Sequence, residues 1–164
     1  MTRTHGSIGT LPIECINKKY NKYRIRWDFQ PSYENDKQNG VTFFEAEINH
    51  KPSMDEIKEI VLEGYNKEID KKIVSGFVWK EMPIWLSFEN QFNYKAAYDL
   101  AVTFGGNLPC TFKFGTMLNP VYYEFTDTED LTDFYLSAMN YINNTLAEGW
   151  KEKDNIDWSI YNIE

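Results

Sequence analysis

Four acidic residues lie close together in the sequence, at Asp127, Glu129, Asp130 and Asp133. A glycosidase uses two carboxyl groups at a fixed separation across a cleft, and clustered carboxylates can also bind Ca²⁺. Here the acids occupy the start of a predicted helix, where the helix dipole favours negative charge. The glycine-centred twelve-residue loop of an EF-hand calcium site is also missing. We therefore interpret these residues as capping acids on a solvated helix face.

The sequence holds little other material for catalysis. Its two cysteines, Cys15 and Cys110, are far apart, and its two histidines, His5 and His50, have no closely spaced metal-ligating partner. A zinc site needs such a partner, and a disulfide framework needs more cysteines. Neither a phosphate-binding loop nor a nucleophile elbow occurs in the sequence. The sequence therefore predicts two reduced thiols, no metal site, no cofactor and no catalytic residue, as expected of a protein that is not an enzyme.

Segment 82–94 carries the densest set of side chains suited to binding. Its three amides stand between Trp85 and Tyr94. One interpretation is a planar hydrogen-bonding pocket, and the other is a strand-to-helix corner whose amides tie down the loop. In the second case we expect replacement of a buried Trp85 to damage the fold. The candidate binding residues are Trp85, Asn90, Gln91, Asn93 and Tyr94 at this corner, with Trp158 and Tyr161 near the C-terminus.

Composition limits the partners that the chain can have. Of its 164 residues, 42% are hydrophobic and 16% are aromatic, and the net charge is −8. This charge repels a phosphate backbone, so we expect no nucleic-acid binding. No apolar run approaches the roughly 18 residues of a membrane-spanning helix, so we expect no membrane insertion. The aromatic residues either fill a core or form a contact surface, and composition leaves both alternatives open.

Alternation of apolar and polar residues predicts a hairpin near the start of the chain. The first strand runs from Tyr23 to Phe29 and is stopped by Pro31, and the second covers residues 41–49. The polar stretch between them ends in an Asn-Gly turn signal at residues 39–40. The outer face would bring Arg24 and Arg26 near two glutamates, Glu45 and Glu47, as cross-strand charge partners on a solvated face.

Capping signals and helical spacing predict the remaining elements. A capping box at Ser53 and Glu56 opens a helix that Gly76 closes, and Ser87 caps a second helix. A third, the longest, covers residues 128–154, opened by a second capping box at 126–129. Short strands are expected at 77–79, 84–86, 110–114 and 121–125. The order β-β-α-β-α-β-β-α indicates an α+β fold, with a mainly antiparallel sheet and about three helices packed on one side.

The sequence predicts one α+β domain over residues 20–157, flanked by an N-terminal arm (1–19) and an apolar C-terminal tail (158–164). The tail contains Trp158, Ile160, Tyr161 and Ile163, which are costly to leave in water. Such a tail docks either on its own domain or on a partner. Because the domain already has many aromatic rings to cover, we expect the chain to self-associate or to dock through its ends.

Three stretches carry a resemblance to a known kind of domain: residues 85–94, 108–115 and 149–157. Together they resemble a small domain of unknown function that recurs in bacteriophages and prophages, in tail-fibre and tail-associated proteins. The resemblance covers about residues 77–157, and residues 1–76 have none. No catalytic residue is known for this family, so none is carried over.

The resemblance implies a non-enzymatic bacteriophage structural protein that acts through protein–protein contacts in the virion, in a tail or a tail fibre. Its partners would be other phage structural proteins or further copies of itself. It would be made in the cytoplasm of the host bacterium and located in the virion. Two alternatives remain open: a carbohydrate-binding module for host-surface glycans, and a tail-fibre assembly chaperone.

Overall fold

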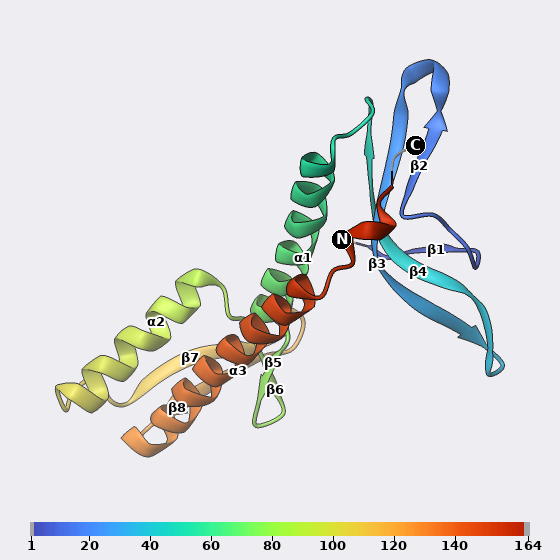
Figure 1. Ribbon diagram of the computed structural model, residues 1–164. Coiled ribbons are helices and arrows are strands. Elements are labelled where there is room, and N and C mark those ends of the chain that lie inside the picture. Colours follow the sequence, from blue (N-terminus) through green and yellow to red (C-terminus); the bar gives the residue numbers. More distant parts are fainter. Residues whose placement is uncertain (1, 163–164) are drawn as a thin grey trace. The chain divides into compact units, whose positions relative to one another are not determined.

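The computed structural model describes residues 2–162, which form two compact units (Figure 1). Within the described range, the first contains residues 2–68 with 152–162, and the second is Ile69–Lys151. The described strands pair antiparallel and alternate with helices in the predicted order, which confirms the α+β class. The described strands form three separate sheets instead of the one that the sequence predicted. The sequence also predicted a single domain over residues 20–157, whereas the chain divides into two units.

The first unit contains a four-stranded sheet in the order β1-β4-β3-β2. Its strands are β1 (Thr4–Gly6), β2 (Ile13–Asn17), β3 (Lys22–Glu34) and β4 (Lys37–Ile48). A 3₁₀ turn (Lys18–Tyr20) joins β2 to β3. Segment 1–19, predicted as an arm, therefore supplies both edge strands of the sheet. Its backbone is held because β1 pairs with β4 and β2 pairs with β3.

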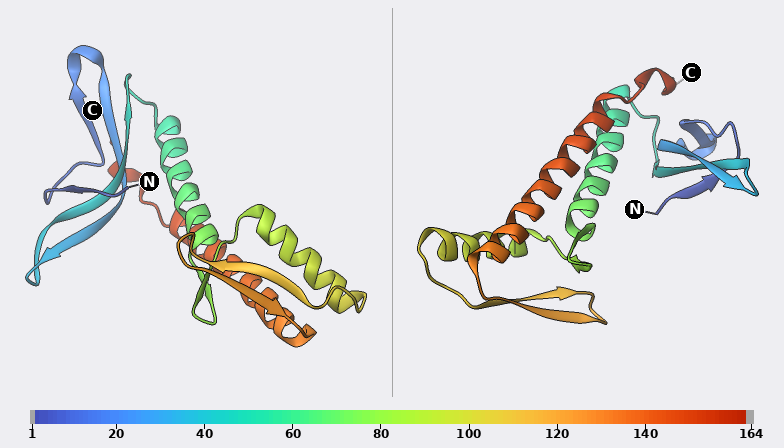
Figure 2. Two further views of the ribbon diagram at one scale, coloured as in Figure 1. Left: turned by 180° about the vertical axis from the view of Figure 1, so that it is seen from behind. Right: turned by 90° about the horizontal axis from the view of Figure 1, so that it is seen from below.

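The β3–β4 hairpin is longer than predicted and bends along its length (Figure 2). Pro31 does not stop the first strand, which continues to Glu34. The turn lies at Asn35 and Asp36, which have φ angles of 50° and 60°, and the predicted Asn-Gly turn at 39–40 is part of β4. Both turn residues tolerate left-handed backbone, which explains why the chain reverses there.

The charged face of this hairpin forms as predicted. Arg24 pairs with Glu47, and Arg26 Nε lies 3.3 Å from Glu45 Oε2. Arg26 is only 5% exposed, because Glu14 of β2 adds a second carboxylate at 2.9 Å and the ring of Phe43 lies under the guanidinium. The face is therefore less solvated than expected around this arginine.

The core of the first unit lies between the sheet, the first turns of α1 (Met54–Ser75) and the C-terminal segment. Its centre is Trp27, which is 1% exposed. Ser53 caps α1, since its hydroxyl accepts from the Glu56 amide at 3.2 Å. The other buried members of this core are Ile13, Ile25, Phe44, Ile57, Val61 and Tyr161.

The second unit contains two hairpins and the helices α2 and α3, with the last turns of α1. Its elements are β5 (Phe77–Trp79), β6 (Met82–Ile84), α2 (Phe88–Tyr98), a π-helical turn (Asp99–Thr103), β7 (Cys110–Gly115), β8 (Pro120–Phe125) and α3 (Thr128–Asp154). Asp127 is the cap of α3, because its carboxylate accepts from the Asp130 amide at 2.9 Å; the predicted cap was Thr126. Helix α3 continues through Gly149 without a break.

Aromatic rings fill the core of the second unit. Phe134 of α3 lies at its centre and contacts Trp79, Tyr94 and Phe114 at centroid distances of 5.0–5.1 Å. Edge-to-face and tilted contacts of this kind add stability beyond the area they bury. Much of the unusual aromatic content of the chain is therefore core, which leaves the exposed rings as the ones that need an explanation.

Candidate functional site

The corner between β6 and α2 is held rigid by its own polar side chains. The Asn90 amide donates to the Trp85 carbonyl and the Gln91 amide to the Leu86 carbonyl, both at 2.7 Å. Ser87 caps α2 by accepting from the Asn90 backbone N–H at 3.3 Å. These bonds satisfy carbonyls that would otherwise lack partners where the strand ends. Asn90 and Gln91 therefore tie down the loop, as one of the two sequence interpretations predicted.

The rings on either side of these amides do not form a pocket with them. Tyr94 is 3% exposed and packs edge-on against Phe112, so it belongs to the core. Burial raises its pKa to about 12. Trp85 is 57% exposed, whereas the structural interpretation of the corner expected a buried ring. Asn93 is exposed on α2. Of the five candidate residues at the corner, Trp85 is the one whose aromatic ring is free to bind.

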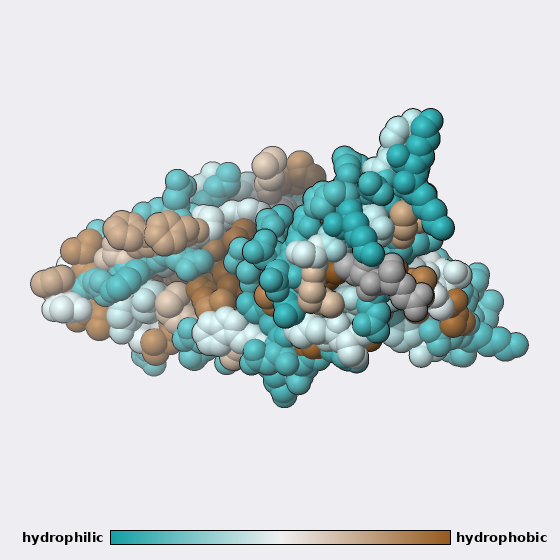
Figure 3. All heavy atoms as spheres, turned by 45° about the horizontal axis from the view of Figure 1, so that its top comes forward, coloured by the Kyte–Doolittle hydropathy of each residue, from teal (hydrophilic) through white to brown (hydrophobic). Residues whose placement is uncertain are grey.

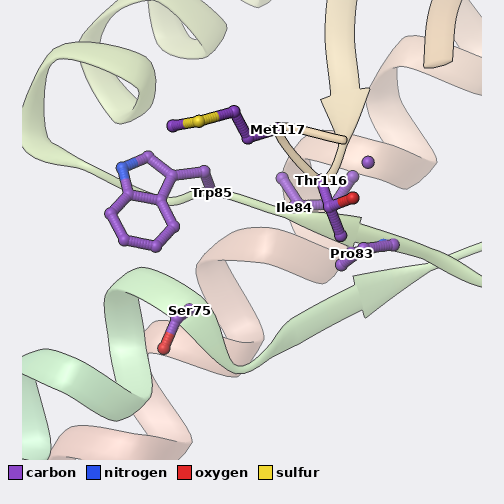
Figure 4. Close-up of a pocket in the computed structure, with 7 residues that line it drawn as sticks. Ser75, Pro83, Ile84, Trp85, Thr116 and Met117 are labelled. Atoms are coloured by element: carbon purple, nitrogen blue, oxygen red, sulfur yellow. The ribbon is translucent and has the colours of Figure 1, made fainter. Parts of the chain in front are cut away.

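Trp85 borders an apolar cavity of about 500 Å³. Its indole comes from the segment that follows β6, the side chain of Met117 comes from the turn between β7 and β8, and both border this cavity (Figure 4). The side-chain polar groups of the lining are the indole N–H of Trp85 and two hydroxyls. The Ser75 hydroxyl donates to the Lys71 carbonyl, and the Thr116 hydroxyl accepts from the Asn119 amide. The cavity therefore has apolar walls and no charge. Its lining residues are Ser75, Pro83, Ile84, Trp85, Gly115, Thr116 and Met117.

The tip of the β7–β8 hairpin extends this apolar surface. Met117 is 93% exposed and Leu118 is 89% exposed. The turn that presents them is ordered, because the Thr116 amide donates to the Asn119 carbonyl at 3.1 Å. Gly115 has a φ of 81°, and a β-carbon there would overlap the Asn119 carbonyl, so this position requires glycine. Two large apolar side chains are thus held on a fixed turn in contact with solvent.

Helix α2 carries further exposed rings. Phe88, its first residue, is 84% exposed, and Phe92 lies one turn later on the same side. Both border a shallow groove with Tyr135 and Met139 of α3. Apolar side chains are visible at the surface among hydrophilic ones (Figure 3). We use the term corner surface for the exposed apolar residues Trp85 and Phe88 of the β6–α2 corner together with Met117 and Leu118 of the hairpin tip.

The two C-terminal candidates lie in the first unit and have a structural role. Tyr161 is 1% exposed, and its hydroxyl donates to the Arg26 carbonyl at 2.9 Å. Burial raises its pKa, and the nearby Tyr65 raises it further. Trp158 packs against the same core, with its ring centroid 5.9 Å from that of Tyr161. The tail therefore docks on its own chain, one of the two alternatives that the sequence left open. Ile163 lies outside the described residues.

Lys80 and Asp130 form an ion pair in the second unit. Lys80 Nζ lies 2.5 Å from Asp130 and 2.9 Å from the Tyr123 hydroxyl, which also donates to Asp130. Burial acts to raise the pKa of Asp130, but the bonds from Lys80 and Tyr123 bring it below its usual value. The bond to Asp130 raises the pKa of Lys80. Both pKa values move away from neutrality, which does not suit acid–base catalysis.

Other chemistry finds little support in the described residues. Cys15 and Cys110 are free thiols, as predicted, and burial raises the pKa of Cys110. Within residues 2–162, no three His, Cys, Asp or Glu side chains gather where they could hold a metal ion. None of the helices in that range combines the length and hydrophobicity that a membrane-spanning segment needs.

Sequence reasoning missed most of the corner surface. It selected Trp85 but not Phe88, Met117 or Leu118. A signal was present, because residues 115–120 read as a hairpin turn and turns are ordinarily polar. The apolar pair Met117-Leu118 at this turn departs from that rule, and exposed apolar residues of this kind often mark an interaction site.

No protein-family model matches this chain, and neither the curated proteins nor the solved structures contain a match.

Proposed function

We propose that this protein is a non-enzymatic structural component of a bacteriophage particle and acts through protein–protein contacts made by the corner surface. The phage assignment rests on the resemblance of residues 77–157 to tail-associated domains. The mode of action rests on a single observation: Trp85 and Met117, both more than half exposed, line an uncharged cavity, and two further exposed apolar side chains, Phe88 and Leu118, lie within three residues of them in the sequence. Clustered exposed apolar residues of this kind mark interaction sites.

The chemistry of the cavity favours a protein partner over a small polar ligand. Small-molecule sites combine apolar walls with a few convergent polar groups that orient the ligand. Here the Ser75 hydroxyl donates within its own helix and the Thr116 hydroxyl accepts from the Asn119 amide of its own turn. An apolar side chain of another protein needs no such groups. Methionine and aromatic residues are also enriched at protein–protein interfaces.

A host-surface glycan is a second candidate ligand, because the exposed indole of Trp85 offers a flat face on which a sugar ring can stack. A glycan array distinguishes the two functions. If the glycan function holds, wild-type protein binds and Trp85→Ala does not. If the contact function holds, neither protein binds any glycan.

The test of the contact function uses purified phage particles. We expect mass spectrometry to find this chain in the particle in a fixed ratio to a known structural protein. The double variant Trp85→Ser with Met117→Ser should fold, because both side chains are exposed, and should be lost from particles. The control Tyr20→Ser, which changes an exposed ring of the first unit, should be retained. Absence of the wild-type chain from finished particles would contradict a virion role and favour the assembly-chaperone alternative.

A further inference from the structure

The sequence placed self-association at the ends of the chain, but the structure uses both ends internally. Segments 4–6 and 13–17 are paired in the sheet, and Tyr161 is buried in the core of the first unit. Other apolar side chains are exposed as well, such as Phe104 at 76%, but those of the corner surface lie beside an apolar cavity. Any self-association should therefore be sought there.

This inference rests on the proposed function and names its partner: we propose that the corner surface binds the corner surface of a second copy of this chain, with Leu118 of each copy inserted into the Trp85 cavity of the other. The cavity of about 500 Å³ falls within the usual size range of binding pockets, so one leucine side chain can enter it.

The arrangement of the projecting side chain and the cavity favours a second copy over an unrelated partner. Thr116 and Met117 line the cavity, and Leu118, the next residue, projects into solvent. Each copy therefore carries the projection and the cavity side by side on one ordered turn. A two-fold contact uses the same surface on both copies, so a projection beside a cavity is self-complementary.

Charge imposes a second condition that the corner surface meets. Each chain carries a net charge of −8, so two copies repel one another wherever they bring acidic groups together. No residue of the cavity lining is charged, and none of the four corner-surface residues is. An uncharged contact avoids both the repulsion and the cost of burying an unpaired charge.

The exposed area is close to what a stable dimer needs. Trp85, Phe88, Met117 and Leu118 are between 57% and 93% exposed. Taking about 150–250 Å² for a large side chain, they present roughly 600 Å² of apolar surface. A standard interface buries about 800 Å² on each partner, so these residues with their immediate neighbours supply most of it.

The test is sedimentation equilibrium of the full chain with three variants. We expect wild type to form a concentration-dependent dimer, and Leu118→Asp to weaken dimerisation at least tenfold by placing a charge in the cavity. Ser75→Phe should also weaken it at least tenfold, because the new ring fills the cavity even though it adds apolar surface. The control Ile8→Asp, at an exposed apolar residue of the first unit, should dimerise like wild type.

Circular dichroism shows whether each variant is folded. If Ser75→Phe does not fold, Thr116→Phe fills the same cavity from an exposed turn residue. Wild type that stays monomeric at about 100 μM would overturn the inference, as would equal weakening by Ile8→Asp and Leu118→Asp. Such a monomer could still be found in particles, so failure of this inference is distinguishable from failure of the proposed function.

Discussion

Gly64 of α1 lies directly against the indole of Trp27 in β3. A β-carbon on Gly64 would overlap three atoms of the indole, Cζ2, Cε2 and Nε1. The helix can approach the sheet this closely only because residue 64 has no side chain. The close approach leaves Trp27 almost completely buried and fixes the centre of the core of the first unit.

Gly64→Ala should therefore destabilise the protein. Alanine in place of glycine in a helix normally stabilises by about 1 kcal/mol, but overpacking a core costs about 1–3 kcal/mol. We expect the overlap with Trp27 to dominate and the unfolding free energy from urea titration to fall. Gly106→Ala is the control, because a β-carbon there meets no atom within 4 Å. A Gly64→Ala variant as stable as wild type would show that the indole can move.

Local signals in the sequence predicted the elements well because their causes are local. A cap such as Ser53 or Ser87 acts on an amide three residues away, and strand alternation is visible within a few residues. The exposure of Trp85 and the burial of Trp79 could not be predicted in this way. Both tryptophans occur in short strand-like runs of the sequence. Trp79 is the one that is covered, because Tyr123 and Phe125 of β8 and Phe134 of α3 pack against its ring.

The division into two units was also beyond the sequence. Helix α1 runs without a break from Met54 to Ser75, although the boundary between the units falls at residues 68 and 69. Helix α3 crosses the second boundary in the same way. Domain boundaries are usually recognised in a sequence by a flexible linker rich in Pro, Gly and polar residues. A boundary inside a continuous helix has no such linker.

Tyr161 should matter for stability more than for association. Replacing a buried aromatic residue by alanine costs about 3–5 kcal/mol, and Tyr161→Ala also removes the bond to the Arg26 carbonyl. We expect thermal and urea unfolding to show this loss without a change in oligomeric state. Ile160→Ala, at a 44% exposed neighbour, should change stability by less than about 1 kcal/mol. An altered oligomeric state with unchanged stability would instead support docking of the tail on a partner.

Alkaline pH should weaken the fold through buried tyrosines. Burial raises the pKa of Tyr94 to about 12, whereas an unfolded tyrosine ionises near 10. The neutral phenol is favoured in the folded state, so its stabilisation is complete below pH 10 and is lost as pH rises from 10 towards 12. We expect urea titrations between pH 9 and 11.5 to show the unfolding free energy of wild type falling with pH more steeply than that of Tyr94→Phe. The two slopes should differ by up to about 1.4 kcal/mol per pH unit. Parallel curves for the two proteins would contradict this assignment.

Two tryptophans of the second unit should separate stability from binding. Trp79 is 6% exposed, donates to Asp133 at 2.9 Å and packs edge-on against Phe134, so Trp79→Ala should cost about 3–5 kcal/mol. Trp85 is 57% exposed, and Trp85→Ala should leave the unfolding free energy within about 1 kcal/mol of wild type.

The same two variants then test what the exposed ring is for. Trp85→Ala removes one wall of the cavity, so the folded variant should self-associate at least tenfold more weakly in sedimentation equilibrium. Trp79→Ala is measured under conditions where it remains folded and should dimerise normally, because its ring lies inside the core and not at the corner surface. If Trp85→Ala instead lost several kcal/mol of stability, the indole would be part of the fold, and the corner surface would lose the residue around which it was defined.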